Sequence, residues 1–283
     1  MGAVWQKLSL VHQVLSLIAV LLTVTLLVFP ASVSAKPVQI VKVKQERYSK
    51  NRLCHYTYQY PQLKGLSNKK VERKLNTFLK QQVIGIYASL GEPVLSVDQE
   101  VEECGRKALE TKEALKRRGE ADELSVFDGL YFRKVYYDIK INKLDLLSIY
   151  IYAFDDSHGY HPDGFNYPLA INIRNGKIYK YSDLFKSRSK YQSKINDLIY
   201  DELKNIQGES VAEEFRDEAQ QSKYNVLISH DGLVIYDLFE RYVDQAIVPV
   251  LRPSVLIKAG IINPEGPLRV FLKSVIARSG GKY

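Results

Sequence analysis

Several short segments of this chain alternate apolar and polar residues, which is the pattern of strands that bury one face. The clearest of them is residues 147–154. Its two faces hold Leu147, Ile149, Ile151 and Ala153 on one side and Ser148, Tyr150, Tyr152 and Phe154 on the other. Because side chains alternate across a strand, the aliphatic face is predicted to pack on helices and the tyrosine face to form a surface.

Other strands are predicted from the same alternation and from the turn residues between them. They are expected at residues 38–43, 53–60, 130–141, 167–174, 177–181, 226–229, 233–236 and 253–257. Asn175-Gly176 and Asp231-Gly232 are typical of tight hairpin turns. Pro61 is expected to end the strand before it, because proline cannot donate to a strand ladder.

Helices are predicted where apolar residues recur at helical spacing. They are expected from Asn68, as N-cap, to about Leu90, and at 98–118 (closed by Gly119), 182–185, 191–206 and 210–221. Antiparallel hairpins with helices gathered beside them favour an α+β fold. We therefore expect antiparallel sheet with helices packed on one face, and two sequence halves that form one compact unit.

The first 35 residues are interpreted apart from the fold. Lys7 is their only charged residue, residues 8–29 are mostly apolar, and Pro30 then interrupts any helix. Val33-Ser34-Ala35 offers the small residues that signal peptidase reads, so a secretory signal cleaved after Ala35 is predicted. The alternative is a retained membrane anchor, since the apolar run is long enough to span a bilayer.

The exported part is predicted to have three sections. Residues 36–125 form an N-terminal section of strands and two helices, 126–257 form an α+β domain, and 258–283 form a basic tail. The tail carries the stripe of an amphipathic helix, made of Leu268, Phe271, Leu272, Val275 and Ile276. We expect this helix to dock on the core rather than to bind membrane.

Cys54 and Cys104 both lie in the exported part. An even number of cysteines in an oxidising compartment favours one disulfide. A bridge across about 50 residues stabilises a fold by about 4 kcal/mol in the chain-entropy account. The alternative is two separate buried thiols.

The net charge of +8 is compatible with contact to anionic envelope polymers or acidic proteins. Nucleic acid is not an expected partner, because no recognition motif accompanies the charge. The densest basic run, residues 106–118, is interrupted by Glu110 and Glu113. It is interpreted as a solvated helix face with ion pairs four residues apart.

The loop after residue 154 contains the only candidate chemistry: Asp155, Asp156, His158, His161 and Asp163. Carboxylates and imidazoles can ligate a divalent metal that activates water, which is the basis of a hydrolase alternative acting on cell-wall polymer. A structural turn is the favoured interpretation, because His158 and His161 lie among Gly and Pro residues that ordinarily form turns. No catalytic residue, metal or cofactor is therefore predicted.

Twenty tyrosines against one tryptophan indicate a tyrosine-rich sheet surface, built from residues 53–60, 131–137 and 147–154. Tyrosine combines a large, stiff contact area with a polar tip, so Tyr150 and Tyr152 are the candidate binding residues, with His161 and Asp163 in the loop beside them. The alternative is cross-strand pairing that merely stabilises the sheet, and the strand propensity of tyrosine favours it.

A family pattern runs from residue 149 to residue 185: a Gly-x-His-Pro loop, a strand, a Gly-Lys turn and an Asp-Leu-Phe helix. Its positions are occupied by Gly159, His161, Pro162, Gly176, Lys177, Asp183, Leu184 and Phe185. The pattern resembles the extracytoplasmic domain of unknown function in the C-terminal part of the anti-sigma factor RsiV, which also occurs beside the catalytic domain of the peptidoglycan deacetylase PdaC. Residues 228–233 resemble the late hairpin of that family, and residues 58–76 resemble its N-terminal companion domain.

The resemblance implies recognition of a protein or of the envelope, because the RsiV domain pair is similar to a lysozyme-binding receptor. Neither an anti-sigma region nor a deacetylase domain is expected in this chain, so those activities do not carry over. We expect a periplasmic or secreted bacterial protein that binds a lysozyme-like protein or a cell-wall glycan without catalysis. A metal-dependent hydrolase acting through His158 and His161 is the alternative.

Overall fold

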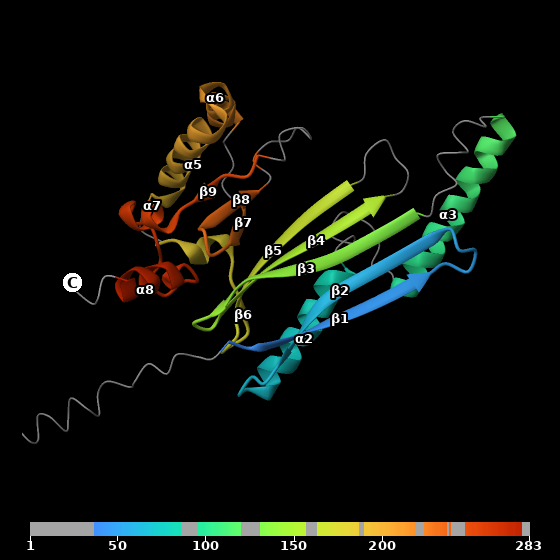
Figure 1. The fold of residues 1–283 in the computed structure, drawn as a ribbon, viewed down its shortest axis with the longest axis horizontal. Coiled ribbons are helices and arrows are strands. Elements are labelled where there is room, and N and C mark those ends of the chain that lie inside the picture. The colour runs from blue at the N-terminus through green and yellow to red at the C-terminus, as the bar shows by residue number, and fades with distance from the viewer. Residues whose placement is uncertain are drawn as a thin grey trace, which may run out of the picture. The chain divides into compact units, whose positions relative to one another are not determined.

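The computed structural model describes residues 37–85, 96–119, 131–156, 163–186, 190–218, 224–236, 238 and 247–278 (Figure 1). The predicted signal and its cleavage site after Ala35 lie outside these residues. Pro37–Tyr283 form one compact unit of mixed α and β structure, as expected. No helix in the described ranges has the length and apolar character needed to cross a bilayer.

Six strands form the main sheet in sequence order. They are β1 (Gln39–Tyr48), β2 (Cys54–Lys64), β3 (Tyr131–Lys143), β4 (Leu146–Asp156), β5 (Asp163–Asn172) and β6 (Lys177–Ile178). Every neighbouring pair is antiparallel except β2 and β3, which run parallel. A parallel pair requires a long crossover, and this one contains the helices α2 (Lys69–Ile84) and α3 (Val97–Arg118).

Both crossover helices begin at residues that satisfy their first backbone N–H groups. The side chain of Asn68 accepts hydrogen bonds from the backbone of Lys70 and Val71, as predicted for an N-cap. Ser96 and Gln99 form a capping box at the start of α3. Gly119 ends α3 in the left-handed conformation, which confirms the predicted stop.

The first core lies between α2, α3 and one face of the main sheet. Leu147, Ile149 and Ile151 of β4 are fully buried there, as the alternation predicted. Leu75 and Leu79 of α2 belong to the same cluster. The disulfide is confirmed as well: Cys54 of β2 is bonded to Cys104 of α3, which fixes this helix to the sheet.

The tyrosines of β2 do not lie on a tyrosine surface, contrary to the prediction. Tyr56 and Tyr58 are each 1% exposed and belong to the first core. The register explains this, since Tyr58 pairs with Val135, which pairs with Ala153 on the buried face of β4. The hydroxyl of Tyr58 donates to the carboxylate of the buried Glu100, 3.4 Å away.

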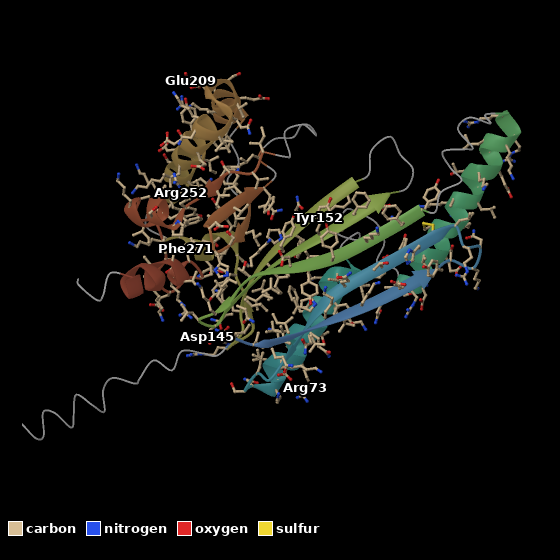
Figure 2. All side chains as sticks on the ribbon, in the orientation of Figure 1. Arg73, Asp145, Tyr152, Glu209, Arg252 and Phe271 are labelled. Carbon is tan, nitrogen blue, oxygen red and sulfur yellow. A yellow bond between two sulfur atoms is a disulfide. The ribbon has the colours of Figure 1, made fainter. Side chains whose placement is uncertain are left out.

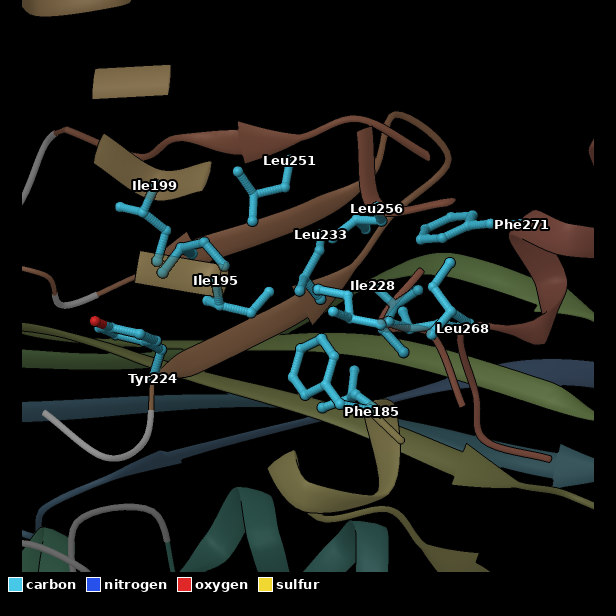
Figure 3. Packing of buried hydrophobic residues seen from close by; sticks show 14 of the residues in the cluster. Phe185, Ile195, Ile199, Tyr224, Ile228, Leu233, Leu251, Leu256, Leu268 and Phe271 are labelled. Atoms are coloured by element: carbon cyan, nitrogen blue, oxygen red, sulfur yellow. The ribbon is translucent and has the colours of Figure 1, made fainter. Parts of the chain in front are cut away.

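A second core is formed by the C-terminal elements. They are α5 (Tyr191–Gln207), α6 (Glu209–Glu218), β7 (Asn225–Ile228), β8 (Leu233–Tyr236), β9 (Val250–Leu251), α7 (Pro253–Lys258) and α8 (Arg269–Arg278). Strands β7, β8 and β9 form a three-stranded antiparallel sheet. Apolar side chains from these elements pack together in one cluster. Figure 3 labels members of it from every one of these elements except α6. The buried Leu268 and Phe271 show that the C-terminal helix docks on this core, as predicted.

The predicted Asp231-Gly232 hairpin joins β7 to β8. Gly232 has a φ of +151°, and a Cβ there would collide with the carbonyl oxygen of Leu251. Glycine is therefore required both by the backbone conformation and by the close approach of the segment that contains β9.

Two predictions that concern proline were also wrong. Residues 253–257 are not a strand, because Pro253 begins helix α7. Proline is favourable at this first position, since the first backbone N–H groups of a helix form no hydrogen bond within it. Pro61 does not end β2, which continues to Lys64. The pairing of β2 with β3 stops at Tyr58, so Pro61 lies where one edge of β2 has no ladder partner among the described strands.

Strand β3 contains a bulge between Ile139 and Ile141. Ile139 pairs with Ile149 and packs on the first core, whereas Ile141 pairs with Ser148 and is buried in the second core. Residues two apart normally share a face, but the extra residue sends these two isoleucines to opposite faces. One strand thereby supplies both cores.

Candidate functional site

The sheet face opposite α2 and α3 has a covered end and an open end. At the covered end Ile141 and Leu146 belong to the second core, and Ser148 is fully buried beside them. At the open end Tyr136 is 41% exposed. We call the open end the aromatic face; it consists of Phe132, Lys134, Tyr136, Tyr150, Tyr152 and Phe154.

Cross-strand pairing aligns the tyrosines of the aromatic face. Tyr136 of β3 lies directly opposite Tyr152 of β4, with ring centroids 4.9 Å apart. The Tyr152 and Tyr150 rings are 6.3 Å apart, and Tyr152 is labelled on the main sheet in Figure 2. A Cβ at Gly164 of β5 would lie 2.7 Å from the Tyr152 phenol oxygen, so the small glycine leaves room for this ring.

Tyr150 marks the boundary between the two ends. Its ring stacks on Tyr236 of β8 at 5.4 Å, and its hydroxyl donates to the side-chain oxygen of Asn166. Burial, together with the neighbouring Tyr236 phenol, raises the pKa of Tyr150 well above its ordinary value. Tyr150 therefore remains a neutral hydrogen-bond donor, and it joins the main sheet to the three-stranded sheet.

The other side of the aromatic face combines phenylalanine rings with a cation. Phe132 and Phe154 stack at 5.5 Å, and the Nζ atom of Lys134 lies 4.5 Å from the Phe132 centroid. This distance is within the range of a cation–π interaction. The Lys134 side chain is exposed, so its ammonium group remains available to solvent.

A second stacked pair, Tyr48 and His55, continues the same sheet surface onto β1 and β2. Their rings are 4.2 Å apart and nearly parallel, and the Arg52 guanidinium lies 5.3 Å from the Tyr48 centroid. Burial lowers the pKa of His55, and the positive charges of Lys134 and Lys44 lower it further against the opposing effect of Glu46. The imidazole is therefore biased toward its neutral form.

The predicted site residues are only partly described. The structure brings Tyr150 and Tyr152 together as predicted, but their role in binding stays a prediction. Asp163 is the first residue of β5, but its side chain is not among those that the structure describes. His158 and His161 lie outside the described residues. Their proposed binding and metal roles therefore stay predictions.

Within the described ranges, no group of three or more His, Cys, Asp or Glu residues is arranged to hold a metal ion. Asp155, part of the candidate loop, forms a salt bridge with Arg133 at 2.5 Å, and both side chains are largely buried. Arg133 also lies over the ring of the core residue Tyr56. This arrangement gives Asp155 a structural role in the sheet.

The residues that carry the family resemblance build a corner in the described part of the chain. Gly176 has a φ of +74°, and Lys177 forms an ion pair with Asp183 at 2.7 Å. The Asp183 carboxylate also accepts the backbone N–H of Lys180, and Phe185 is buried in the second core. These positions determine the path from β5 to the second core, which is a structural function.

A cavity of about 130 Å³ lies between β5 and β7. Pro168 and Ala170 line it from β5, and Val226 and Ile228 line it from β7. Asn225, also in the lining, donates to the carbonyl of Asn166, the residue bonded to Tyr150. The cavity therefore belongs to the junction of the two sheets.

Sequence reasoning missed Tyr136, Lys134 and Tyr236. Tyr136 lies in a segment recognised as tyrosine-rich, but its pairing with Tyr152 depends on the bulge in β3. Lys134 alternates with the buried Val135, which was a usable signal that its side chain points to the open side. The contact between Tyr236 and Tyr150 joins distant parts of the sequence and left no local signal.

The chain is similar in fold to two solved bacterial proteins of the DUF3298 family. The protein from Pseudomonas aeruginosa has 11% sequence identity and a TM-score of 0.53, over 81% of this chain and 96% of its own. The protein from Bacteroides fragilis has 16% identity and a TM-score of 0.55, over 86% of this chain and 98% of its own. No family model and no curated protein sequence matches the chain.

Proposed function

We propose that this protein is an exported envelope protein of bacteria that binds a macromolecular ligand on the aromatic face and catalyses no reaction. The observation that carries the proposal is the row formed by Tyr136 and Tyr152, which is partly exposed on a sheet whose opposite face is already occupied by α2 and α3. Partly exposed rings of this kind offer rigid contact area at little cost in side-chain entropy.

A cell-wall glycan is the ligand that this geometry favours. Tyr136 and Tyr152, with ring centroids 4.9 Å apart, form a partly exposed aromatic platform on which a sugar ring can stack. A lysozyme-like protein is the second candidate. It is favoured by the tyrosine content of the face and by the resemblance to the RsiV and PdaC domain.

Export is supported by two independent features. The N-terminal 35 residues have the composition of a secretory signal. The Cys54–Cys104 disulfide is typical of an oxidising compartment such as the periplasm or the extracellular space. Cleavage after Ala35 is checked by N-terminal sequencing of the protein recovered from the periplasm or medium.

The proposal is tested with residues 36–283 of the protein, incubated with insoluble peptidoglycan and, separately, with immobilised lysozyme. The double variant Tyr136→Ala/Tyr152→Ala is expected to lose at least tenfold in affinity for the ligand retained, because buried aromatic anchors dominate binding energies. Ile206→Ala, which truncates a 46% exposed residue on α5, is the control and should bind like the wild type.

Equal binding by the double variant and the wild type, at equal thermal stability, would remove the aromatic face from the proposal. Retention of neither ligand would remove the proposed function itself. A hydrolysed product in the peptidoglycan incubation, abolished by His161→Ala, would replace it with the hydrolase alternative.

A further inference from the structure

The cations around the aromatic face differ in whether a carboxylate neutralises them. Lys44 forms an ion pair with Glu46, and Lys140 forms one with Asp138. Lys134 forms no ion pair with any of the side chains that the structure describes, and its Nζ atom lies over the ring of Phe132. Among the described side chains, no carboxylate therefore compensates its charge beside the stacked Phe132 and Phe154 rings.

The position of Lys134 relative to the tyrosines is determined by strand geometry. Lys134 and Tyr136 are two residues apart on β3, so they point to the same side about 7 Å from each other. On the neighbouring strand Phe154 lies opposite Lys134 and Tyr152 lies opposite Tyr136. The tyrosine platform and the Lys134 cation thus lie next to each other along the strand direction.

The Lys134 ammonium group lies among aromatic rings. Two aromatic side chains flank it, and the His55 ring lies close enough for its pKa to be lowered by this ammonium group. Because the Lys134 side chain is exposed, an anion bound there gains a modest attraction to the ammonium group that weakens as salt is added. A cationic ligand is repelled by the same charge.

We propose that the aromatic face binds a carboxylated glycan chain, with one sugar ring stacked on Tyr136 and Tyr152 and the carboxylate of an adjacent sugar at the Lys134 ammonium group. This inference rests on the proposed binding function and specifies its ligand. Neutral sugar rings use the tyrosine platform alone. A strongly basic protein such as lysozyme meets unfavourable charge at Lys134.

The test compares two defined probes of equal chain length, an acidic oligogalacturonate and a neutral chito-oligosaccharide, by titration calorimetry with residues 36–283. The wild type is expected to bind the acidic chain more tightly, with an affinity that falls as salt is added. Lys134→Gln should weaken acidic binding about five- to tenfold, the range of one charge pair of about 1 kcal/mol, and should leave neutral binding unchanged.

Two further variants separate charge from packing. Lys134→Arg keeps the cation and should retain most of the acidic preference. Lys80→Gln makes the same charge change at an exposed site on α2, at the opposite side of the sheet, and should bind like the wild type. Equal stability of all variants in thermal unfolding excludes a folding defect.

The outcomes distinguish this inference from the proposed function. If both probes bind equally, depend on Tyr136 and Tyr152, and ignore Lys134→Gln, the face binds glycan but the carboxylate assignment is overturned. If neither probe binds and lysozyme is retained, the glycan ligand is overturned while the binding module stands. If neither probe binds but insoluble peptidoglycan is retained, only the carboxylate assignment is overturned. If the probes, peptidoglycan and lysozyme all fail to bind, both are overturned.

Discussion

The eleven residues of β4 point alternately to two faces of the sheet, and the two faces differ in how far they are buried. On the helix-facing side, Leu147, Ile149, Ile151 and Ala153 are all completely buried. On the other side the side chains change from fully buried at Ser148 to partly exposed at Tyr152. One face is buried in the first core along its whole length, whereas the second core covers the other face at one end only.

The difference indicates where residue identity serves stability and where it is free to serve binding. A leucine or isoleucine in the first core is held by packing that tolerates no loss of volume. A tyrosine at the open end stabilises the sheet by cross-strand contact, which is worth about 0.2–1 kcal/mol, and the rest of its surface remains available.

The largest effect is expected from truncation of the buried face. Ile151→Ala should lower the free energy of unfolding by about 3 kcal/mol, because it leaves a cavity under fully packed neighbours. Tyr136→Ala, on the open face, should cost about 1 kcal/mol or less. Urea denaturation followed by circular dichroism measures both, and equal losses would contradict the contrast between the faces.

Alkaline pH should distinguish the covered tyrosines from ordinary phenols. Burial raises the pKa of Tyr224 to about 12, and burial also raises the pKa of Tyr150 and Tyr181. The unfolded chain loses these protons near pH 10, before the folded protein does. Stability should therefore be constant below about pH 10 and fall as the pH rises toward 12.

The measurement is the urea midpoint across this pH range. Tyr224→Phe should reduce the slope of the decline while lowering stability at neutral pH, because the Tyr224 hydroxyl donates to Asn196 at 2.8 Å. A midpoint that does not change up to pH 12 would show that these phenols titrate normally.

The smallest effect is expected at Ser148, and it has the opposite sign. Its hydroxyl is fully buried, and no hydrogen-bond partner is found for it in the described part of the chain. Ser148→Ala removes an unsatisfied polar group, so it should raise the unfolding free energy by up to about 1 kcal/mol. A clear loss of stability, measured by thermal unfolding, would reveal a partner for this hydroxyl.

The parts of the fold that depend on local chemistry were predictable from the sequence. The alternation of β4, the cap at Asn68 and the two glycine hairpins each follow from a few adjacent residues. The burial of Tyr58 was not predictable, because it depends on the parallel pairing of β2 with a strand that follows two helices. Pro253 was misjudged because its helix is only six residues long.

The candidate site was predictable only in part, for a similar reason. The positions of Tyr150 and Tyr152 follow from the alternation of one strand. Their partners on β3 do not: if the pairing that starts at the two-residue turn, Leu144 and Asp145, continued without a bulge, Tyr137 would lie opposite Tyr152. The bulge replaces Tyr137 with Tyr136. A single inserted residue thus decides which tyrosine joins the aromatic face, and no local pattern marks it.

The bulge in β3 also determines how the molecule can come apart. Ile139 and Ile141 are two residues from each other, yet each is held by a different core. Strand β3 thereby couples the two cores, and we expect them to unfold together in one cooperative transition. A cut between them would leave Ile141 without its neighbours, so we expect neither piece to fold alone.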